Sequence, residues 1–375
     1  MRSLHKCPFR PDDTGKVRAP PSGPAIFLHH FFGESLILAP FPFQDGGRFM
    51  KVCVFGAGAI GGHVAARVIA AQAAEVSLIT RGRQLEAIRA RGLVLLTEGK
   101  EITARPAAAT DDPATLPPQD VVIVTMKAHS LPGVADALAR LVAPQGVIVF
   151  VLNGIPWWWR LGLPGAAGPL PLLDPQSSLW TKLREKTLGC VVYGPVEVRE
   201  PGVIFHFSGN RWLIGEPDGS KSARLKAVVD LFNASGLKAE IPADLRLEVW
   251  RKGFGNVAGN SLAALTRLPG ADFGTVPGLQ DIYASLMRET LEVAARLGWD
   301  LRPEVDVDKA ARRSDSSRFR SSMLQDVDAG RPMEVEGLLG QVQAFAQETG
   351  VAVPVMDCIL PLLRGLDASL RKSNP

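Results

Sequence analysis

The sequence predicts an α/β domain on the N-terminal side, built on a parallel sheet, followed by an all-α domain. Two observations support this prediction. Short apolar runs with the pattern of buried strands alternate with helical patterns up to about residue 217, and helical patterns alone follow from there. The 375 residues are also enough for two hydrophobic cores. We therefore expect an extension at 1–49 and two domains, at 50–217 and 218–375.

The extension at 1–49 is expected to have no packed core of its own. It holds 7 of the 29 prolines and shows no sustained strand or helix period. Its apolar segment is interrupted by His29 and His30 and comes too late for a signal peptide. Met50 directly precedes the first predicted strand. We therefore hypothesise that Met50 is the physiological start and that 1–49 is not part of the native protein.

The composition favours a cytoplasmic protein with a small-molecule partner, and it leaves a homodimer open. The net charge of +4 comes from charges spread along the chain, without the basic stripe expected of a nucleic-acid-binding protein. No run of about 18 uncharged apolar residues is present, so we expect no membrane span. The four cysteines lie far apart without a C-x-x-C pair, which argues against a disulfide scaffold and against a metal site.

The first predicted strand, 51–55, is followed at once by a G-x-G-x-x-G turn and a helix rich in small residues. In this arrangement Gly56 makes the tight turn, Gly58 lets the backbone approach a pyrophosphate, and Gly61 permits close packing of helix and strand. Free N–H groups at the helix N-terminus bind the anion. We interpret the domain as a dinucleotide-binding Rossmann domain. Its predicted cofactor contacts in the turn are Gly56, Ala57, Gly58, Ala59, Ile60 and Gly61.

The end of the second predicted strand, 76–80, favours NADP(H) over NAD(H). An acidic residue there would bind the ribose 2′-hydroxyl and exclude a 2′-phosphate. The chain instead has Arg81 and Arg83, and a guanidinium binds phosphate in a bidentate fork. Glu75 precedes the strand and would lie at its wrong end. The alternative is that one of the two arginines, above all Arg83, is only a solvated charge in the loop.

Two further predicted strands, 120–126 and 146–152, each end at a polar residue. Lys127 follows the first and Asn153 the second. Because ligands bind at the carboxyl ends of strands in such sheets, both side chains are expected to face the crevice. The alternatives are a surface lysine for Lys127 and, for Asn153, an Asn-Gly turn selected for its backbone alone.

The remaining segments complete the two domains. Residues 160–177 are rich in Gly, Pro and Leu without periodicity, which indicates a loop insertion. Short strands are expected at 190–194, 203–207 and 211–215. Helical patterns follow at 220–235, 244–266, 276–297, 319–328, 334–349 and 356–370.

Elimination indicates a lysine as the proton donor for a hydride-transfer reaction. Neither Tyr193 nor Tyr283 has a lysine four residues later, the last histidine is His206, and Cys and His do not cluster. On the predicted helix 244–266 a polar row recurs every four residues and so shares one face; its members are Glu248, Lys252, Asn256 and Asn260. This row either lines a polar cavity or is a solvated stripe with a Glu248–Lys252 pair.

Five ordered blocks now resemble the ketopantoate reductases, also called 2-dehydropantoate 2-reductases. The blocks are G-A-G-A-I-G at 56–61, T-M-K-A at 125–128, N-G-I-P-W-W at 153–158, W-R-K-G-F-G-N-V-A-G-N at 250–260 and S-S-M-L-Q-D…G-R-P-M-E-V-E at 321–336. The resemblance runs from Met50 to about Val355. It implies a Rossmann domain followed by a helical domain like that of 6-phosphogluconate dehydrogenase, and NADPH-dependent reduction of 2-dehydropantoate to pantoate.

The resemblance also implies roles for single residues. Lys252 resembles the general acid that protonates the C2 oxygen, and Glu334 resembles a second catalytic residue that holds the substrate's hydroxyl side or orders the lysine. Ser322 resembles the residue that binds the substrate carboxylate. Asn256, Asn260 and Asn153 are the other expected substrate contacts, and Lys127, Asn153 and Glu334 are further expected cofactor contacts.

Some positions depart from the family pattern and leave the substrate open. Gly253 and Phe254 follow the lysine where other residues are common, and Phe319 stands where a substrate-binding asparagine is expected. The tryptophans at 157–159 and the insertion at 160–177 are expected to border the substrate side. The alternatives are therefore a reductase of another branched 2-oxo acid and a non-catalytic NADPH-binding regulatory protein.

Overall fold

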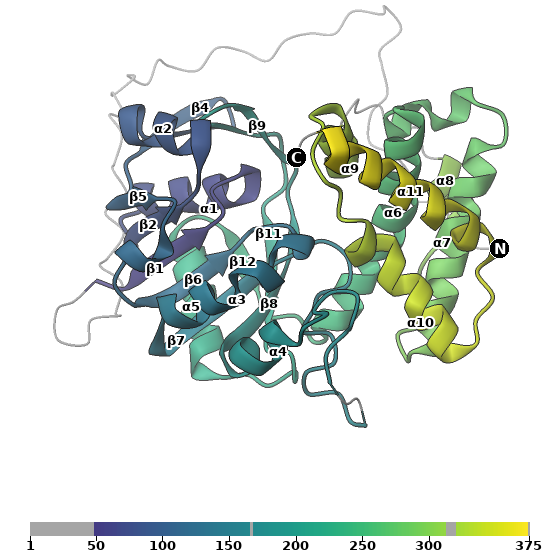
Figure 1. The fold of residues 1–375 in the computed structure, drawn as a ribbon, viewed down its shortest axis with the longest axis horizontal. Coiled ribbons are helices and arrows are strands. Elements are labelled where there is room, and N and C mark those ends of the chain that lie inside the picture. Colours follow the sequence, from purple (N-terminus) through teal and green to yellow (C-terminus); the bar gives the residue numbers. More distant parts are fainter. Residues whose placement is uncertain (1–48, 166–167, 313–319, 374–375) are drawn as a thin grey trace, which may run out of the picture. The chain divides into compact units, whose positions relative to one another are not determined.

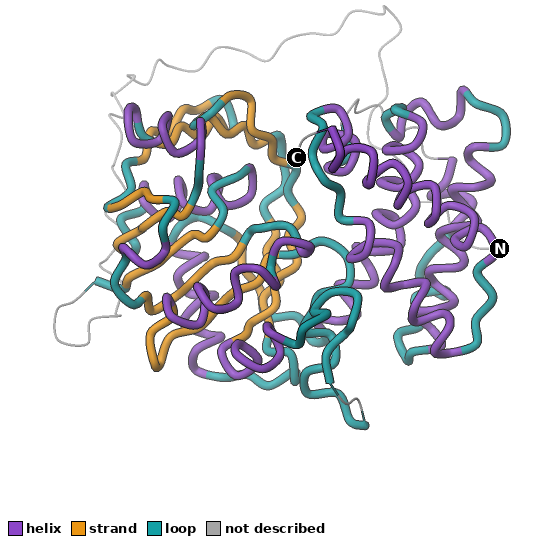
Figure 2. Tube along the Cα trace, in the orientation of Figure 1, coloured by secondary structure: helices purple, strands orange, loops and turns teal. Residues whose placement is uncertain are grey.

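The computed structural model describes residues 49–165, 168–312 and 320–373. The predictions for the extension at 1–49 and for Phe319 thus lie outside the described residues, apart from Phe49. The described residues all belong to one compact unit. The predicted fold class is confirmed: a mostly parallel sheet with helices comes first, and helices alone follow (Figure 2).

An eight-stranded sheet forms the centre of the α/β part, in the order β12-β11-β8-β7-β6-β1-β2-β5 (Figure 1). Its pairs are parallel except for β8 with β11. The strands are β1 (Lys51–Phe55), β2 (Glu75–Ile79), β5 (Ala108–Thr110), β6 (Gln119–Val124), β7 (Val142–Val151), β8 (Thr187–Tyr193), β11 (Arg211–Gly215) and β12 (Lys238–Glu240).

The register of this sheet aligns the carboxyl ends of its central strands. Phe55 of β1 is opposite Ile79 of β2 and Val124 of β6, and Val124 is opposite Phe150 of β7. The loops that follow these four strands therefore leave from one edge of the sheet. Since crevice ligands of such sheets bind at this edge, the fold places the predicted cofactor and site loops together.

Five helices belong to the α/β part: α1 (Ala59–Ala70), α2 (Gly82–Arg91), α3 (Ala135–Leu141), α4 (Ser178–Leu183) and α5 (Ala223–Ala234). A second sheet, which the sequence analysis did not predict as a unit, has the order β4-β3-β10-β9. Its strands are β3 (Leu93–Thr97), β4 (Lys100–Ala104), β9 (Val196–Glu200) and β10 (Val203–His206). It packs on α1, so the first helix lies between two sheets.

The α/β part continues beyond the expected boundary at 217. Strand β12 pairs with β11, and α5 contributes Leu225, Val228 and Phe232 to the same core as β1. This core reaches Ala239 because β12 extends the sheet by one more strand. The sequence Lys-Ala-Glu of β12 has no apolar run, so no period in the sequence marked it as a strand.

The helical part consists of α6 (Leu245–Thr266), α7 (Leu279–Arg296), α8 (Val307–Arg312), α9 (Ser322–Asp328), α10 (Gln341–Thr349) and α11 (Pro354–Ser373). A π-helical turn, Glu336–Gly340, precedes α10. Helices α7, α9 and α11 all pack against α6 (Figure 1). The central helix is thus held from several sides, which fixes the face that carries the polar row.

The insertion and the tryptophan run have different structures. The described residues of 160–177 form neither helix nor strand, as expected. Trp157, Trp158 and Trp159 are all buried, and Trp159 packs against Trp250 of α6 and Phe345 of α10. The three tryptophans thus belong to the hydrophobic core, where large aromatic side chains gain from burial. That the run borders the substrate side stays a prediction.

Candidate active site

The glycine turn after β1 has the geometry that an approaching pyrophosphate needs. Gly56 has φ +106°, and a Cβ there would lie 3.0 Å from the Met126 side chain. A Cβ at Gly61 would lie 2.2 Å from the Gly56 carbonyl oxygen, so the helix packs directly on the turn. Gly58 is exposed, with open space where a Cβ would point. The three glycines thus have the steric reasons that the motif predicts.

The N-terminus of α1 leaves donors for an anion. Its cap, Gly58, provides no side-chain hydrogen bond, and the first turn has no acidic residue. The first N–H groups of a helix have no partner inside the helix, and the helix dipole favours negative charge there. The residues at 56–61 therefore fit a phosphate-bearing cofactor.

The segment after β2 carries exposed arginines and no acid. Arg81 caps α2, Arg83 lies in its first turn, and both are exposed. Neither makes a hydrogen bond or ion pair with any residue that the structure describes. Glu75 is the first residue of β2 and lies opposite Lys51, at the amino end of the sheet. The end of β2 thus has cations that are free to meet a phosphate.

Lys252 of α6 reaches the loop after β7. Its Nζ donates a hydrogen bond to Asn153 Oδ1 at 2.7 Å and lies 6.0 Å from the centroid of the Tyr193 ring. Burial lowers the pKa of Lys252 to about 8, and the Cys190 thiol and the Glu334 carboxyl, the titratable groups that face it, act in the opposite direction. An ammonium with this pKa can give up a proton near neutral pH.

The polar row on α6 is not a solvated stripe. Glu248 is buried and pairs with Arg251 instead of Lys252, so the alternative of a Glu248–Lys252 pair is wrong. Asn256 is half-buried and Asn260 is 6% exposed, and neither side chain hydrogen-bonds to another described residue. Because a buried amide without a partner costs free energy, these two amides are suited to a ligand.

Two contacts tie Glu334 and Lys127 together across the two parts of the chain. The backbone N–H of Ala128 donates to Glu334 Oε1 at 3.0 Å, and Lys127 Nζ donates to the Pro332 carbonyl at 3.2 Å. Lys127 also forms an ion pair with the buried Asp326. Burial raises the pKa of Glu334, while the Ala128 N–H bond and the nearby lysines oppose that shift.

The geometry also separates Glu334 from Glu336, which the sequence could not. Glu336 turns to α11, where Arg364 donates to both of its carboxylate oxygens at 2.8 Å. Glu334 instead turns to Ala128 at the edge of the sheet. Only Glu334 is therefore directed toward Lys127 and Lys252.

Ser322 lies in the first turn of α9 and is exposed. The preceding Ser321 caps the helix by accepting a hydrogen bond from Leu324 N at 3.3 Å. Ser322 itself makes no hydrogen bond with another described residue. Since α9 packs against α6, the hydroxyl is on an element adjacent to the polar row, although no contact joins it to Lys252.

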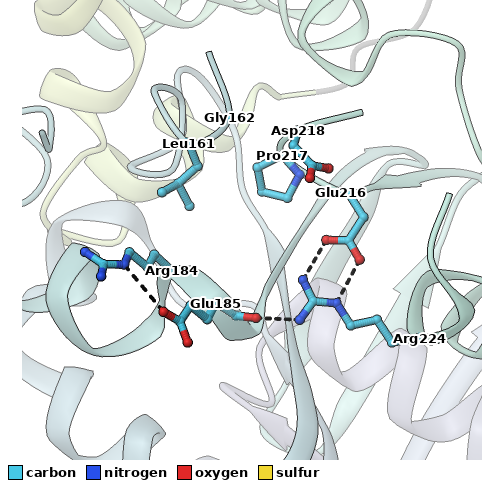
Figure 3. A pocket seen from close by; sticks show the side chains of 8 residues that line it. All are labelled: Leu161, Gly162, Arg184, Glu185, Glu216, Pro217, Asp218 and Arg224. Atoms are coloured by element: carbon cyan, nitrogen blue, oxygen red, sulfur yellow. Dashed lines mark hydrogen bonds and ion pairs between the residues drawn. The ribbon is translucent and has the colours of Figure 1, made fainter. Parts of the chain in front are cut away.

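One cavity adjoins this site and another lies away from it. The first, of about 340 Å³, is lined by Glu334, Gly337 and His129 together with Arg371 of α11. The other, of about 270 Å³, is drawn in Figure 3. There Arg224 donates two hydrogen bonds of 2.7 Å each to the Glu216 carboxylate, so these two charges neutralise each other. None of the predicted site residues lines this cavity.

Sequence reasoning missed several neighbours of Lys252 and Lys127. Asp326, the partner of Lys127, lies inside the block at 321–326 and could have been found there. Cys190 and Tyr193 lie on β8 and have no motif, so no signal in the sequence marked them. Across the described residues, no group of three or more His, Cys, Asp or Glu could hold a metal ion, and no helix is long and apolar enough to cross a membrane.

The fold and the site together define an oxidoreductase with a dinucleotide-binding domain. The family model described as ketopantoate reductase PanE/ApbA matches residues 52–219, and the model of the C-terminal part matches 244–367. The chain therefore belongs to the ketopantoate reductase family.

Individual relatives agree with this. A 2-dehydropantoate 2-reductase of Mesorhizobium japonicum is 36% identical over 84% of this chain and 98% of its own. A ketopantoate reductase homologue from Ralstonia solanacearum MolK2 has a solved structure with TM-score 0.78, 32% identity, and coverage of 86% of this chain and 99% of its own. A D-mandelate dehydrogenase with NADH and anilino(oxo)acetate shares the fold, with TM-score 0.73, 22% identity, and coverage of 86% and 100%. Membership of the ketopantoate reductase family indicates a nicotinamide cofactor in general.

Proposed function

We propose that this protein reduces 2-dehydropantoate to pantoate with NADPH, and that Lys252 is the general acid. The observation that carries the proposal is the hydrogen bond of 2.7 Å from Lys252 Nζ to Asn153 Oδ1. It brings the one lysine of the polar row to the carboxyl end of β7, next to the edge where the glycine turn lies. The choice of 2-dehydropantoate as substrate rests on the relatives that are named 2-dehydropantoate 2-reductase.

The residues that would hold the cofactor are those at the sheet edge. The turn at 56–61 and the N-terminus of α1 would bind the pyrophosphate, and Arg81 with Arg83 would bind the 2′-phosphate. Lys127 lies in the loop after β6, and Glu334 accepts a hydrogen bond from Ala128 of the same loop. Both would contact the nicotinamide side of the cofactor. When bound, the reduced nicotinamide supplies the hydride that is transferred to C2 of the substrate.

The chain's own residues would complete the reaction. The C2 oxygen gains negative charge as hydride arrives, and the Lys252 ammonium donates a proton to that oxygen, which leaves a neutral amine to be reprotonated from water. Asn153 orients the ammonium, while Asn256, Asn260 and Ser322 would donate hydrogen bonds to the substrate's polar groups. Glu334 would accept a hydrogen bond from the substrate hydroxyl.

The test is NADPH oxidation on addition of 2-dehydropantoate, followed by absorbance. Lys252→Ala is expected to lose turnover while its Kd for NADPH stays within about twofold of wild type, because the lysine acts on the substrate. NADPH binding without turnover of any 2-oxo acid would refute the proposal and favour the regulatory alternative.

A reductase of another branched 2-oxo acid is the second candidate. The buried Gly253 follows Lys252, and a Cβ there would meet nothing within 4 Å. The space beside the lysine therefore leaves room for a different acyl group. A panel of 2-oxo acids assayed side by side, with NADH as control, would rank kcat/KM among them.

A further inference from the structure

The Asn153–Gly154 turn makes a second contact with the helical part, beside the one to Lys252. Gly154 has φ +72°, and a Cβ there would lie 2.2 Å from the carbonyl oxygen of Gly337. The same oxygen accepts a hydrogen bond from the backbone N–H of Ile155 at 2.7 Å. The Gly337 carbonyl thus occupies the space that a side chain at 154 would need.

A local irregularity of the helix makes this carbonyl available. Gly337 lies in the π-helical turn Glu336–Gly340, where the helix is widened and the usual pattern of hydrogen bonds is interrupted. Arg364 of α11 holds the start of the turn through its two bonds to Glu336. Such turns occur frequently at functional sites, and this one begins two residues after Glu334.

We propose that the backbone contact between Gly154 and Gly337 positions the Asn153 amide against the Lys252 ammonium. This inference rests on the proposed function. Lys252 is on α6, and the π-helical turn packs on α6. The two contacts therefore attach adjacent residues of one turn to two elements that pack on each other, so a shift of one contact is expected to disturb the other. Gly154 and the Gly337 carbonyl are positioning groups that act through Asn153.

The size of the expected effect follows from the clash. Real Cβ atoms essentially never lie within 3.0 Å of another heavy atom, so a side chain at 154 must separate the turn from Gly337 by about 1 Å. A misplacement of about 1 Å can cost about 100-fold in rate when it moves a catalytic group. Because Asn153 is the next residue, its amide moves with the turn.

The experiment compares Gly154→Ala and Gly154→Asn with a matched control. Asn adopts positive φ more easily than Ala, so Gly154→Asn keeps the clash with less backbone strain. Gly99 has the same φ of +72° but has nothing within 4 Å of its Cβ position, so Gly99→Ala carries the strain alone. We expect kcat/KM to fall tenfold or more in both Gly154 variants and to stay at the wild-type value in Gly99→Ala.

A double-mutant cycle with Asn153→Ala separates positioning from a general structural effect. If Gly154 acts through Asn153, Gly154→Ala costs almost nothing more in kcat once the amide is gone. The inference would be overturned if the losses of the two single variants multiplied in the double variant. It would also be overturned if both Gly154 variants kept the wild-type kcat/KM.

Two further measurements keep the inference testable. If the Gly154 variants do not fold, hydrogen exchange of the wild-type Ile155 amide decides: exchange as fast as at the Gly99 turn would overturn the contact, and protection would support it. Lys252→Ala distinguishes the two proposals, because turnover without Lys252 refutes the proposed function, whereas a cycle with independent losses refutes only the positioning role.

Discussion

Asn153→Ala tests the contact that carries the proposed function. The substitution removes Oδ1, the acceptor at 2.7 Å from Lys252 Nζ, and leaves the Gly154 turn in place. A hydrogen bond to a charged donor contributes about 1.5 to 3 kcal/mol. Lys252 is half-buried, so water replaces part of this bond and the lower end of the range applies. The expected loss is about 1.5 to 2 kcal/mol, or about tenfold to thirtyfold in kcat.

The pH dependence gives this prediction a sign. In the wild type, Asn153 Oδ1 stabilises the charged form of Lys252. Its removal in Asn153→Ala therefore lowers the pKa of Lys252 further, and the alkaline limb of kcat/KM moves to lower pH. Asn153→Asp places a carboxylate there instead, which stabilises the ammonium and moves the limb to higher pH. Stopped assays over the pH range with NADPH and the best 2-oxo acid measure both. Alkaline limbs that coincide in wild type, Asn153→Ala and Asn153→Asp would show that Asn153 does not interact with Lys252.

Three further predictions concern the lysine, the arginines and a glycine. Because Lys252 must be protonated to act and its pKa is lowered to about 8, we expect wild-type kcat/KM to decline as pH rises through about 8; a profile flat to pH 10 would contradict this. Arg81→Ala should raise KM for NADPH about tenfold or more with little change for NADH, and Arg83→Ala should do so less, as steady-state kinetics with both cofactors will measure. Gly253→Ala and its control Gly365→Ala each add a methyl group inside a helix, at a position with nothing within 4 Å. Each should raise the free energy of unfolding, measured by urea titration, by about 0.5 to 1 kcal/mol. Only Gly253→Ala should change KM for the 2-oxo acid.

The sequence was informative where a motif states a steric requirement. The turn at 56–61 predicts strand, tight turn and helix because only glycine has the φ of Gly56 and the close approach of Gly61, and the structure has both. The row on α6 was predicted from the helical period, since residues four apart share a face. The sequence could not decide whether that row lines a polar cavity or faces solvent, because the partner of Lys252 is 99 residues away in the chain.

The parts that sequence reasoning missed depend on pairing between distant segments. The second sheet brings β3 and β10 together, and the three residues of β12 become a strand only because β11 is beside them. Asp326 was inside a recognised block, yet its pairing with Lys127 required the packing of α9. Periodicity reports which face a residue is on, but not which element that face meets.

The position of Lys252 depends on the first two turns of α6. Asp244 caps the helix by accepting from Arg246 N and Leu247 N at 2.8 and 3.1 Å. Arg246 is buried and donates to the backbone carbonyls of Trp159 and Leu161, in the segment after β7, and of Pro217, after β11, which ties the helix to both segments.

The aromatic cluster continues this support. Trp250, two residues before Lys252, packs edge to face on Trp159. Asn153, the partner of that lysine, comes from the same segment after β7 as Trp159. The donor and its acceptor are therefore held by one buried cluster. Because that cluster fixes the helix, α6 can tolerate Gly253 and Gly255 around the lysine, where a helix of ordinary packing would lose about 1 kcal/mol for each glycine. The buried tryptophans thus help to fix the position of α6, and with it that of Lys252.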